Sequence, residues 1–361
     1  MNKVYLYKVY RILKTKLDSF LGNFYPLDKT LKEMVKRPFE LHLELTNLCN
    51  ANCIFCPYQF QETKTEFMSD KVFYKAVKDY IDIGGGSVML TPIVGEALID
   101  PKFLERVRYL RSIKSIDRIK IVTNGILLDK HGIEEVLNSG LTEIDISTAG
   151  FDKEMYTRIY RSSAYTRMKE NVEKIVELNS KKEEPILITI ALRSDRPLKE
   201  VLKDKDFQPI LKYNPIIDFT WSYTTAGGRI TKEMLSPNMK LRELTKHSLP
   251  CVNLFNGPIV LPDGMVLACS CTAAMDAIDD LGIGNIMDST LLELWKGYKM
   301  EEIRKGFGTD KLNNTCKNCD AYREPDLYKT FEGRKRAKIN LQRLKGDLVF
   351  RGKSTEPFSG G

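Results

Sequence analysis

The sequence predicts an α/β protein built on a parallel β-sheet, and two observations support that prediction. Short strand-like apolar runs alternate with longer helix-like stretches between residues 41 and 221. Such an alternation is typical of parallel strands joined by crossover helices. The alternating region covers about 180 residues, fewer than the roughly 250 of a full eight-fold barrel, so we expect a smaller sheet, curled or open.

The elements follow one another regularly along the chain. The predicted strands are Leu41–Leu45, Ser87–Leu90, Arg118–Val122, Glu143–Ser147, Ile186–Leu192 and Ile217–Trp221. The predicted helices are Lys71–Ile83, Pro101–Ser112, Gly132–Leu137, Arg167–Leu178 and Leu198–Leu211. After Trp221 the alternation stops. There we predict a β-hairpin over Ile259–Leu267 that turns at Asp263-Gly264, then a helix over Thr290–Lys305.

The charge is uneven along the 361 residues. The 56 lysines and arginines exceed the 48 acidic residues by 8, and the surplus lies mainly near the two ends. Residues 1–37 are predicted to form a basic amphipathic helix, packed on the main domain or resting on a membrane surface. The apolar positions of that helix are Leu6, Val9, Leu13, Leu17 and Phe20. A basic flank is either plain solvated surface or a binding surface for nucleic acid, acidic membrane or phosphorylated substrate.

The chain carries eight cysteines without an export signal. It has no run of eighteen apolar residues, so no transmembrane segment is expected, and we predict a cytoplasmic protein. In a reducing compartment, closely spaced cysteines are expected to be metal ligands rather than disulfide partners.

The first cysteine group, Cys49, Cys53 and Cys56, follows the first predicted strand directly. Three thiolates within eight residues can occupy three corners of one 4Fe–4S cluster, which leaves one iron open to another molecule. Zinc is the alternative, and it would need a fourth Cys or His nearby. His42 is the near histidine, but it lies within an apolar strand, where a structural role is expected.

The C-x3-C-x2-C spacing, with Phe55 before the last cysteine, resembles the signature of the radical S-adenosylmethionine (SAM) enzymes. Gly95-Glu96 follows the second strand and is similar to the family's Gly-Glu motif, although Val94 and Ala97 stand where many members have glycine and proline. The resemblance implies that this motif holds the amino group of SAM.

Two further turns resemble the family's cofactor-binding loops. Thr123-Asn124-Gly125 is similar to its Thr-Asn-Gly turn, and Ser147 stands where a serine typically faces the cofactor. Arg161 and Arg167 are both candidates for the partner of the SAM carboxylate. All these motifs come just after predicted strands one to four, whose carboxyl ends form the ligand side of a parallel sheet. We therefore expect them to converge on one rim, with Phe55 among the cofactor contacts.

The second cysteine group contains Cys251, Cys269, Cys271, Cys316 and Cys319. Its arrangement around the hairpin and the following helix resembles the twitch domain, the shortened form of the SPASM extension of radical SAM enzymes. Three intervening segments are similar to that module's framework, namely residues 261–264, 281–286 and 292–295. The resemblance implies that Cys251, Cys269, Cys316 and Cys319 hold one auxiliary 4Fe–4S cluster. A structural zinc ribbon is the alternative.

Cys271 is left over by this assignment. Lying two residues after Cys269, it is expected to be a replacement ligand, a hydrogen-atom donor or an inert buried thiol. The resemblance as a whole implies a partial (β/α)6 barrel followed by a small twitch domain. We expect four segments: an N-terminal helix and lead-in (1–37), the barrel (38–235), the auxiliary domain (236–325) and a basic tail (326–361).

The implied chemistry begins with reductive cleavage of SAM by a two-cluster enzyme, giving a 5′-deoxyadenosyl radical that abstracts hydrogen from a C–H bond. The preferred reaction is oxidation of an alcohol to a ketone, with the auxiliary cluster as electron acceptor, because the arrangement resembles that of 2-deoxy-scyllo-inosamine dehydrogenase. Arg229, between barrel and twitch domain, would assist deprotonation. The first alternative is an epimerase in which Cys271 donates a hydrogen atom.

Peptide maturation is a second alternative, weakened because 37 residues before the first strand are too few for the leader-binding domain that such maturases often carry. A third is a non-catalytic zinc protein that binds nucleic acid, but no stacking-aromatic motif supports it, and we expect no nucleic-acid partner. The expected substrate is a sugar, aminocyclitol or nucleotide sugar, and the basic surplus favours a phosphorylated or nucleotide-linked form. A reductant such as flavodoxin or ferredoxin is the expected electron donor.

Overall fold

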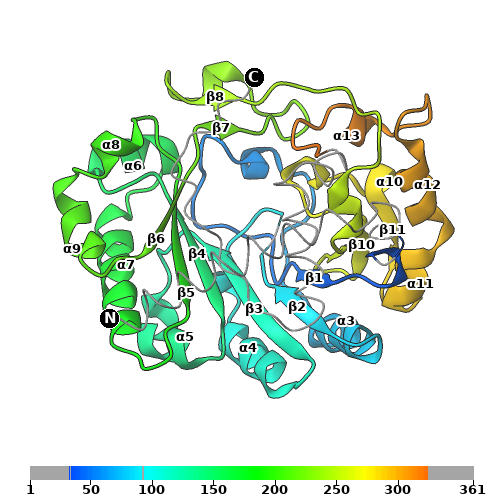
Figure 1. Cartoon of the computed structure of the whole chain (residues 1–361), viewed down its shortest axis with the longest axis horizontal. Coiled ribbons are helices and arrows are strands. Elements are labelled where there is room, and N and C mark those ends of the chain that lie inside the picture. Colours follow the sequence, from blue (N-terminus) through cyan, green and yellow to red (C-terminus); the bar gives the residue numbers. More distant parts are fainter. Residues whose placement is uncertain (1–31, 33, 92, 324–361) are drawn as a thin grey trace, which may run out of the picture.

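The computed structural model describes residue 32 and residues 34–91 and 93–323 (Figure 1). Six parallel strands lie side by side in sequence order and form a partial barrel, as predicted. They are β1 (Glu40–Leu43), β2 (Gly86–Met89), β3 (Ile116–Thr123), β4 (Glu143–Thr148), β5 (Leu187–Leu192) and β6 (Ile216–Phe219). Every bound lies within two residues of the sequence prediction.

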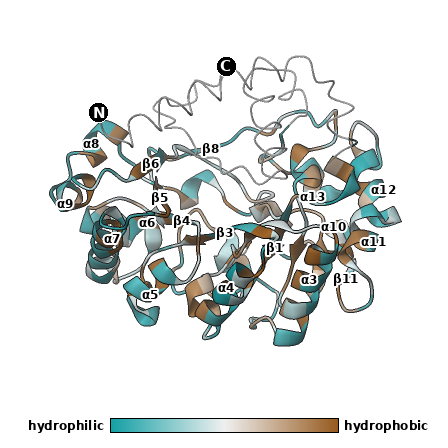
Figure 2. Ribbon diagram, turned by 60° about the horizontal axis from the view of Figure 1, so that its bottom comes forward, coloured by the Kyte–Doolittle hydropathy of each residue, from teal (hydrophilic) through white to brown (hydrophobic). Residues whose placement is uncertain are grey.

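Helices cover the outer side of this sheet (Figure 1). They include α3 (Asp70–Asp82), α4 (Phe103–Ser112), α5 (Ile133–Asn138) and α7 (Tyr165–Ser180), all four predicted. Helix α3 starts where the Ser69 side chain accepts the Val72 N–H, and it buries an apolar stripe that includes Phe73 and Tyr80. Figure 2 shows hydrophilic and hydrophobic residues on opposite sides of several of these helices.

Two predicted helices are wrong as single elements. The segment Leu198–Leu211 contains two short helices, α8 (Leu198–Val201) and α9 (Gln208–Leu211). Proline lacks a backbone N–H and clashes with the preceding turn, so it is unfavourable inside a helix but tolerated in the first turn. The chain accordingly starts a new helix, α9, with Pro209 in its first turn. The predicted Thr290–Lys305 helix is α11 (Leu291–Lys296) and α12 (Tyr298–Gly306), separated by Gly297, whose backbone is extended with ψ of 162°.

The C-terminal part continues the same sheet. Strand β9 (Ile259–Val260) pairs in parallel with β1, and the antiparallel strands β10 (Met265–Leu267) and β11 (Gly282–Asn285) follow it. The predicted hairpin turn is confirmed: Asp263 accepts the Met265 N–H, and Gly264 has a φ of +89°. Strand β11 was not predicted, because its two glycines weaken the strand pattern.

Short elements complete the described chain. Helix α6 (Lys153–Tyr160), which was not predicted, lies between β4 and α7. Strands β7 (Ser222–Tyr223) and β8 (Lys240–Leu241) form a separate parallel pair. Helices α10 (Ile278–Leu281) and α13 (Asn314–Lys317) belong to the C-terminal part. In Figure 1 the β7–β8 segment passes along the upper side, between the six-stranded sheet and α13.

One face of the central strands carries a buried charge network. Lys120 of β3 lies 2.5 Å from the Asp145 carboxylate of β4, and Arg118 pairs with Glu143 one step along the same strands. The alternate residues of both strands, such as Ile119 and Ile144, are fully buried on the other face. The sheet is therefore covered on both sides, as parallel sheets usually are.

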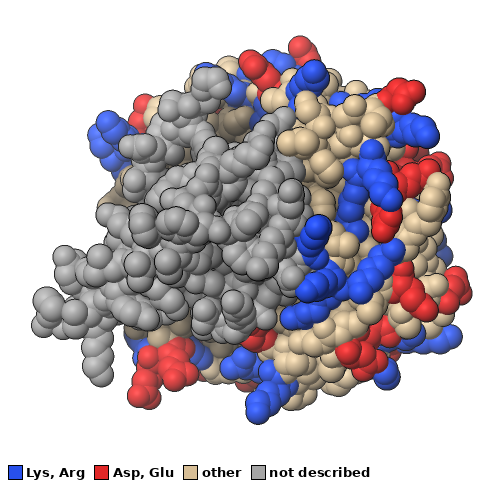
Figure 3. Space-filling model, turned by 45° about the vertical axis from the view of Figure 1, so that its right-hand side comes forward, with Lys and Arg blue, Asp and Glu red and all other residues tan. Residues whose placement is uncertain are grey.

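Two sequence predictions fall outside the described residues: the amphipathic positions from Leu6 to Phe20 and the basic tail after residue 326. Within the part of the chain that the structure describes, no helix combines the length and the apolar character needed to cross a membrane. On the face turned forward in Figure 3, lysine and arginine side chains form a band beside scattered acidic ones.

Candidate active site

The first cysteine group lies on the loop that leaves β1. Cys49, Cys53 and Cys56 are all partly buried, and the Cys56 N–H donates to the Cys53 carbonyl at 3.0 Å. The last turn of α6 anchors this loop, because the Ile159 carbonyl accepts the Ile54 N–H at 2.9 Å and the Tyr160 carbonyl accepts the Asn52 N–H at 3.3 Å.

The chemistry of these thiols fits a bound cluster. Burial raises the pKa of Cys49 to about 12 and that of Cys56 to about 11, and it raises the pKa of Cys53 well above its usual range. The neighbouring thiols raise the pKa of Cys53 further because their negative charges would repel one another. Three crowded thiolates therefore need a positive centre to stabilise them, which bound metal supplies.

Two tyrosine rings contact Phe55, the residue before the last cysteine of the loop. The Phe55 ring contacts the rings of Tyr160 and Tyr223, with centroids 5.6 and 5.4 Å away. The Tyr160 hydroxyl forms a hydrogen bond of 2.8 Å with the hydroxyl of Ser147, near the end of β4. The structure thus brings the predicted residues Phe55 and Ser147 to the same tyrosine, which the sequence analysis missed.

Gly95 lets the loop after β2 press against the loop after β1. Its φ is +109°, and a Cβ atom there would lie 2.6 Å from the Thr46 carbonyl oxygen, so only glycine fits without a shift. The next residue, Glu96, donates its N–H to the Leu48 carbonyl at 2.7 Å. The Gly-Glu pair is therefore fixed directly beside the cysteine loop.

The Glu96 carboxylate joins the loops after β2 and β3. It accepts the Asn124 N–H at 2.7 Å and the Leu98 N–H at 3.2 Å, and the residue is only 1% exposed. Burial raises the pKa of Glu96 to about 7, against the lowering effect of these donors and of the Thr123 hydroxyl. The Asn124 side chain in turn donates to the Asn50 side chain at 2.7 Å, within the cysteine loop. The loops after β1, β2 and β3 therefore converge, as predicted from the strand order.

The two candidate arginines have different surroundings. Arg161, in the left-handed region with a φ of 46°, donates to the Gln59 side chain at 2.9 Å, three residues beyond Cys56. Arg167 forms an exposed ion pair of 2.9 Å with Asp129. Arg161 is thus beside the cysteine loop, whereas the Arg167 guanidinium is engaged by an acidic partner.

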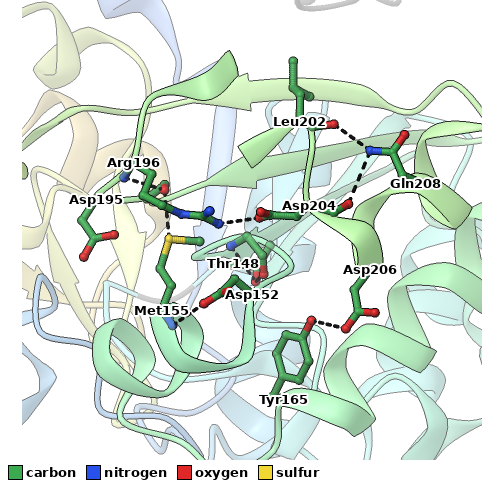
Figure 4. A network of polar contacts seen from close by, with 12 residues as sticks. Thr148, Asp152, Met155, Tyr165, Asp195, Arg196, Leu202, Asp204, Asp206 and Gln208 are labelled. Atoms are coloured by element: carbon green, nitrogen blue, oxygen red, sulfur yellow. Dashed lines mark hydrogen bonds and ion pairs between the residues drawn. The ribbon is translucent and has the colours of Figure 1, made fainter. Parts of the chain in front are cut away.

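A polar network behind this rim supports α6 (Figure 4). Asp152 caps the helix by accepting the Met155 N–H at 2.8 Å. On the segment after β5, the Ser194 hydroxyl donates to the Met155 sulfur at 3.2 Å, and Arg196 pairs with Asp204 at 2.6 Å. The network holds the helix whose last carbonyls anchor the cysteine loop.

The second cysteine group lines a single pocket in the C-terminal part. The five cysteines Cys251, Cys269, Cys271, Cys316 and Cys319 share it with apolar side chains such as Leu254 and Phe307. Cys271, the surplus residue of the sequence analysis, therefore joins the four predicted ligands. It accepts hydrogen bonds from the Cys269 thiol and from the Asn253 side chain, the latter at 3.1 Å, and these bonds contribute to lowering its pKa to about 7.

Burial is the main cause of the raised pKa values of three other thiols in this pocket. Burial raises the pKa of Cys251 to about 11 and of Cys316 to about 12, and it raises the pKa of Cys319 above its usual range. Within residues 34–91 and 93–323, no three His, Cys, Asp or Glu side chains are arranged as ligands of a single metal ion. The expectation that each cysteine group holds a cluster therefore rests on the number of thiols that lie together, not on a ready-made arrangement for one metal ion.

Two aspartates connect the cysteine groups, and neither was expected from the sequence. Asp276, five residues after Cys271, accepts the N–H groups of Glu62 and Thr63, each at 3.1 Å, and the Thr63 hydroxyl. Thr63 follows Cys56 by seven residues.

The second link is Asp320, next to Cys319. Its carboxylate accepts the Thr224 hydroxyl and the Thr225 N–H, each at 2.6 Å, beside the Tyr223 ring that contacts Phe55. Arg229, from the same segment, donates to the Ala226 carbonyl at 3.3 Å and is partly buried. No local pattern predicts the contacts of Asp276 and Asp320, because each aspartate binds residues that are far away in the chain.

Comparison with known proteins agrees with this arrangement. Residues 43–207 match the radical SAM superfamily, and residues 251–320 match an iron–sulfur cluster-binding domain, SPASM. GTP 3',8-cyclase of Staphylococcus haemolyticus is 23% identical over 350 residues, covering 88% of this chain and 99% of that protein. The enzyme of the same name from Staphylococcus carnosus is 22% identical over 351 residues, with the same coverage.

A solved structure, Streptococcus suis SuiB bound to precursor peptide SuiA, has a TM-score of 0.58 and 15% identity over 83% of this chain and 75% of that one. At that identity the likeness concerns the fold. The fold and the two matches define a radical SAM enzyme with an auxiliary iron–sulfur domain. The chain belongs to the radical SAM superfamily and carries a SPASM-type domain, so its cofactors are 4Fe–4S clusters and SAM.

Proposed function

We propose that this chain oxidises an alcohol group of a hydroxylated small molecule to a ketone, with the auxiliary cluster as electron acceptor. The observation that carries the proposal is the pocket lined by five cysteines, tied to the first cysteine group through Asp276 and Asp320. An oxidation needs an acceptor for the second electron near the site of hydrogen abstraction. A cluster held by the five-cysteine pocket would be such an acceptor, because the two aspartates join that pocket to the first cysteine group. A redox-neutral reaction would need no such acceptor.

In this proposal Cys49, Cys53 and Cys56 hold the first cluster, and Cys251, Cys269, Cys316 and Cys319 hold the second. The SAM site is formed by Gly95 and Glu96 for its amino group and by the residues Phe55, Thr123, Asn124 and Ser147. Arg161 is favoured over Arg167 for its carboxylate, because Arg167 is paired with Asp129. When bound, the first cluster and SAM supply the 5′-deoxyadenosyl radical that removes a hydrogen atom from the substrate carbon.

The alcohol carbon loses a hydrogen atom, which ends in 5′-deoxyadenosine, and the hydroxyl loses a proton to water, a loss that the positive charge of Arg229 would favour. The auxiliary cluster, when bound, would take up the remaining electron, so that the substrate loses two electrons in total. An external reductant of the flavodoxin or ferredoxin class supplies the electron that starts each turnover.

The surroundings of Cys271 favour oxidation over epimerisation. A hydrogen-atom donor must face the substrate as a protonated thiol, whereas Cys271 shares a pocket with the predicted ligands and accepts a hydrogen bond from Asn253. A replacement ligand or a stabilised thiolate agrees better with that position. The name of GTP 3',8-cyclase, a relative at 23% identity, includes a nucleotide, which agrees with a nucleotide-linked substrate.

The test is a substrate panel of aminocyclitols, sugar phosphates and nucleotide sugars, incubated with the reconstituted protein, SAM and a strong reductant. We expect 5′-deoxyadenosine and a product two mass units lighter than the substrate, with no solvent deuterium at its carbon. Cys271→Ala should keep this activity, and Cys53→Ala should abolish SAM cleavage. Deuterium incorporated from heavy water, with loss of turnover in Cys271→Ala, would identify an epimerase instead.

A further inference from the structure

An arginine side chain is buried inside the C-terminal part. Arg304, on α12, is only 6% exposed. Its guanidinium donates to the Leu254 carbonyl from Nε at 3.2 Å and from Nη2 at 3.1 Å, and to the Trp295 carbonyl at 3.3 Å. It also lies over the rings of Trp295 and Phe255, at 4.5 and 5.3 Å from their centroids. These contacts fix the guanidinium in one place.

The positive charge of Arg304 has no carboxylate partner among the residues that the structure describes. Glu301, three residues earlier on the same helix, pairs with Lys305 at 2.7 Å instead. Burial lowers the pKa of Arg304 to about 10, so the side chain is still charged at neutral pH. Carbonyl oxygens and aromatic faces offset only part of the cost of burying a charge. A negative group bound nearby would offset more of it.

Arg304 lies directly behind the wall of the five-cysteine pocket. The Leu254 carbonyl that it binds belongs to the turn that starts at Cys251, because the Leu254 N–H donates to the Cys251 carbonyl at 3.0 Å. Leu254 lines the pocket, and so does Phe307, three residues after Arg304. Both side chains are buried and apolar, so the wall between the guanidinium and the thiols has a low dielectric constant.

A positive charge at this position would act on a bound iron–sulfur cluster. A 4Fe–4S cluster with four thiolate ligands is an anion, and reduction adds one further negative charge. The attraction of a nearby cation is therefore larger for the reduced state, and a low-dielectric wall strengthens it. Net charge is one of the factors that set the reduction potential of such a cluster. The charge of Arg304 would accordingly raise the potential of a cluster held in the five-cysteine pocket.

We propose that Arg304 raises the reduction potential of the auxiliary cluster and thereby favours its uptake of an electron from the substrate. The inference rests on the proposed function, in which this cluster gains one electron as the substrate radical loses one and becomes a ketone. Arg304 binds the Cys251 turn and not the reacting atoms, so its role is to tune the cluster rather than to take part in catalysis directly.

The test is an anaerobic redox titration of the auxiliary cluster, followed by electron paramagnetic resonance, in the full chain whose first cysteine group is changed to alanine. Arg304→Gln should disfavour reduction about tenfold, which lowers the midpoint potential by about 59 mV for a one-electron couple. Arg304→Lys keeps the charge, so its potential should lie closer to that of the parent chain. The matched control is Arg106→Gln, which should leave the potential unchanged. Arg106 is also buried over an aromatic ring, but it lies on α4 and pairs with Asp100.

The potentials of the two Arg304 variants decide whether the charge is the cause. An unchanged potential in Arg304→Gln would overturn the proposal, and so would an equal decrease in Arg304→Lys. Loss of the auxiliary irons from both variants would also overturn it, because Arg304 would then be needed to form the pocket. These titrations need no substrate, so the proposed oxidation is still judged by ketone formation and solvent deuterium. The expected shift, without a ketone from any alcohol of the panel, would contradict the proposed oxidation alone.

Discussion

Replacement of Glu96 by glutamine is expected to remove a pH dependence from SAM binding. The carboxylate is buried, and burial raises its pKa to about 7, so it is largely neutral at pH 6 and largely ionised at pH 8. A neutral carboxyl attracts the amino group of SAM less than a carboxylate does, so affinity must rise with pH. The ionised fraction grows from about one tenth to about nine tenths over this range, which corresponds to about ninefold in affinity, or about 1.3 kcal/mol.

The assay is calorimetric titration of SAM into the reconstituted protein between pH 6 and 8. The amino group of SAM also titrates, so the pH dependence that remains in Glu96→Gln belongs to the ligand, and the difference from wild type belongs to Glu96. Glu44→Gln is the matched control, because Glu44 is another buried glutamate with a raised pKa, of about 8, outside the proposed SAM site. Identical pH profiles for the wild type and Glu96→Gln would refute the assigned role.

Three further substitutions test the structure around the site. Gly95→Ala should lower the free energy of unfolding by about 3 kcal/mol and abolish SAM binding, because the added Cβ atom would lie 2.6 Å from a carbonyl oxygen. Gly132→Ala is the control: its Cβ atom would meet only a flexible side chain, so urea unfolding should show a loss of about 1 kcal/mol. Asp276→Ala should cost about 2 kcal/mol through three lost hydrogen bonds and slow oxidation of the substrate more than SAM cleavage, and equal effects on both rates would argue against a linking role. Lys120→Met should lower the free energy of unfolding by about 3 to 5 kcal/mol, because it removes the buried positive charge 2.5 Å from the Asp145 carboxylate, and a neutral effect would contradict the buried network.

The sequence predicted the sheet because strand and helix patterns are local. Each of the six parallel strands is a short apolar run, and the turn at Asp263-Gly264 has its own chemistry. Strand order then placed the motifs after β1 to β3 on one rim, since parallel strands end at a common edge. The structure brings these loops together through the hydrogen bonds of Glu96 and Asn124.

The parts that the sequence did not predict depend on long-range contacts. Nothing near Tyr160 or Tyr223 indicates that both rings would contact Phe55, since the partners are 105 and 168 residues away from that ring. The pairing of β9 with β1, and the Asp276 link to Thr63, also join remote segments. In the predicted Leu198–Leu211 helix, Pro209 was a local signal of a break. The prediction followed the spacing of apolar residues and did not use that signal.

Iron, sulfide and zinc content per chain tests the central claim most directly. After anaerobic reconstitution we expect about eight irons in the wild type, falling to about four when Cys49, Cys53 and Cys56 are changed to alanine. About four should also remain when Cys251, Cys316 and Cys319 are changed, with SAM cleavage retained in that variant only. About four irons with one zinc in the wild type would contradict the account, because the auxiliary site would then hold no electron acceptor.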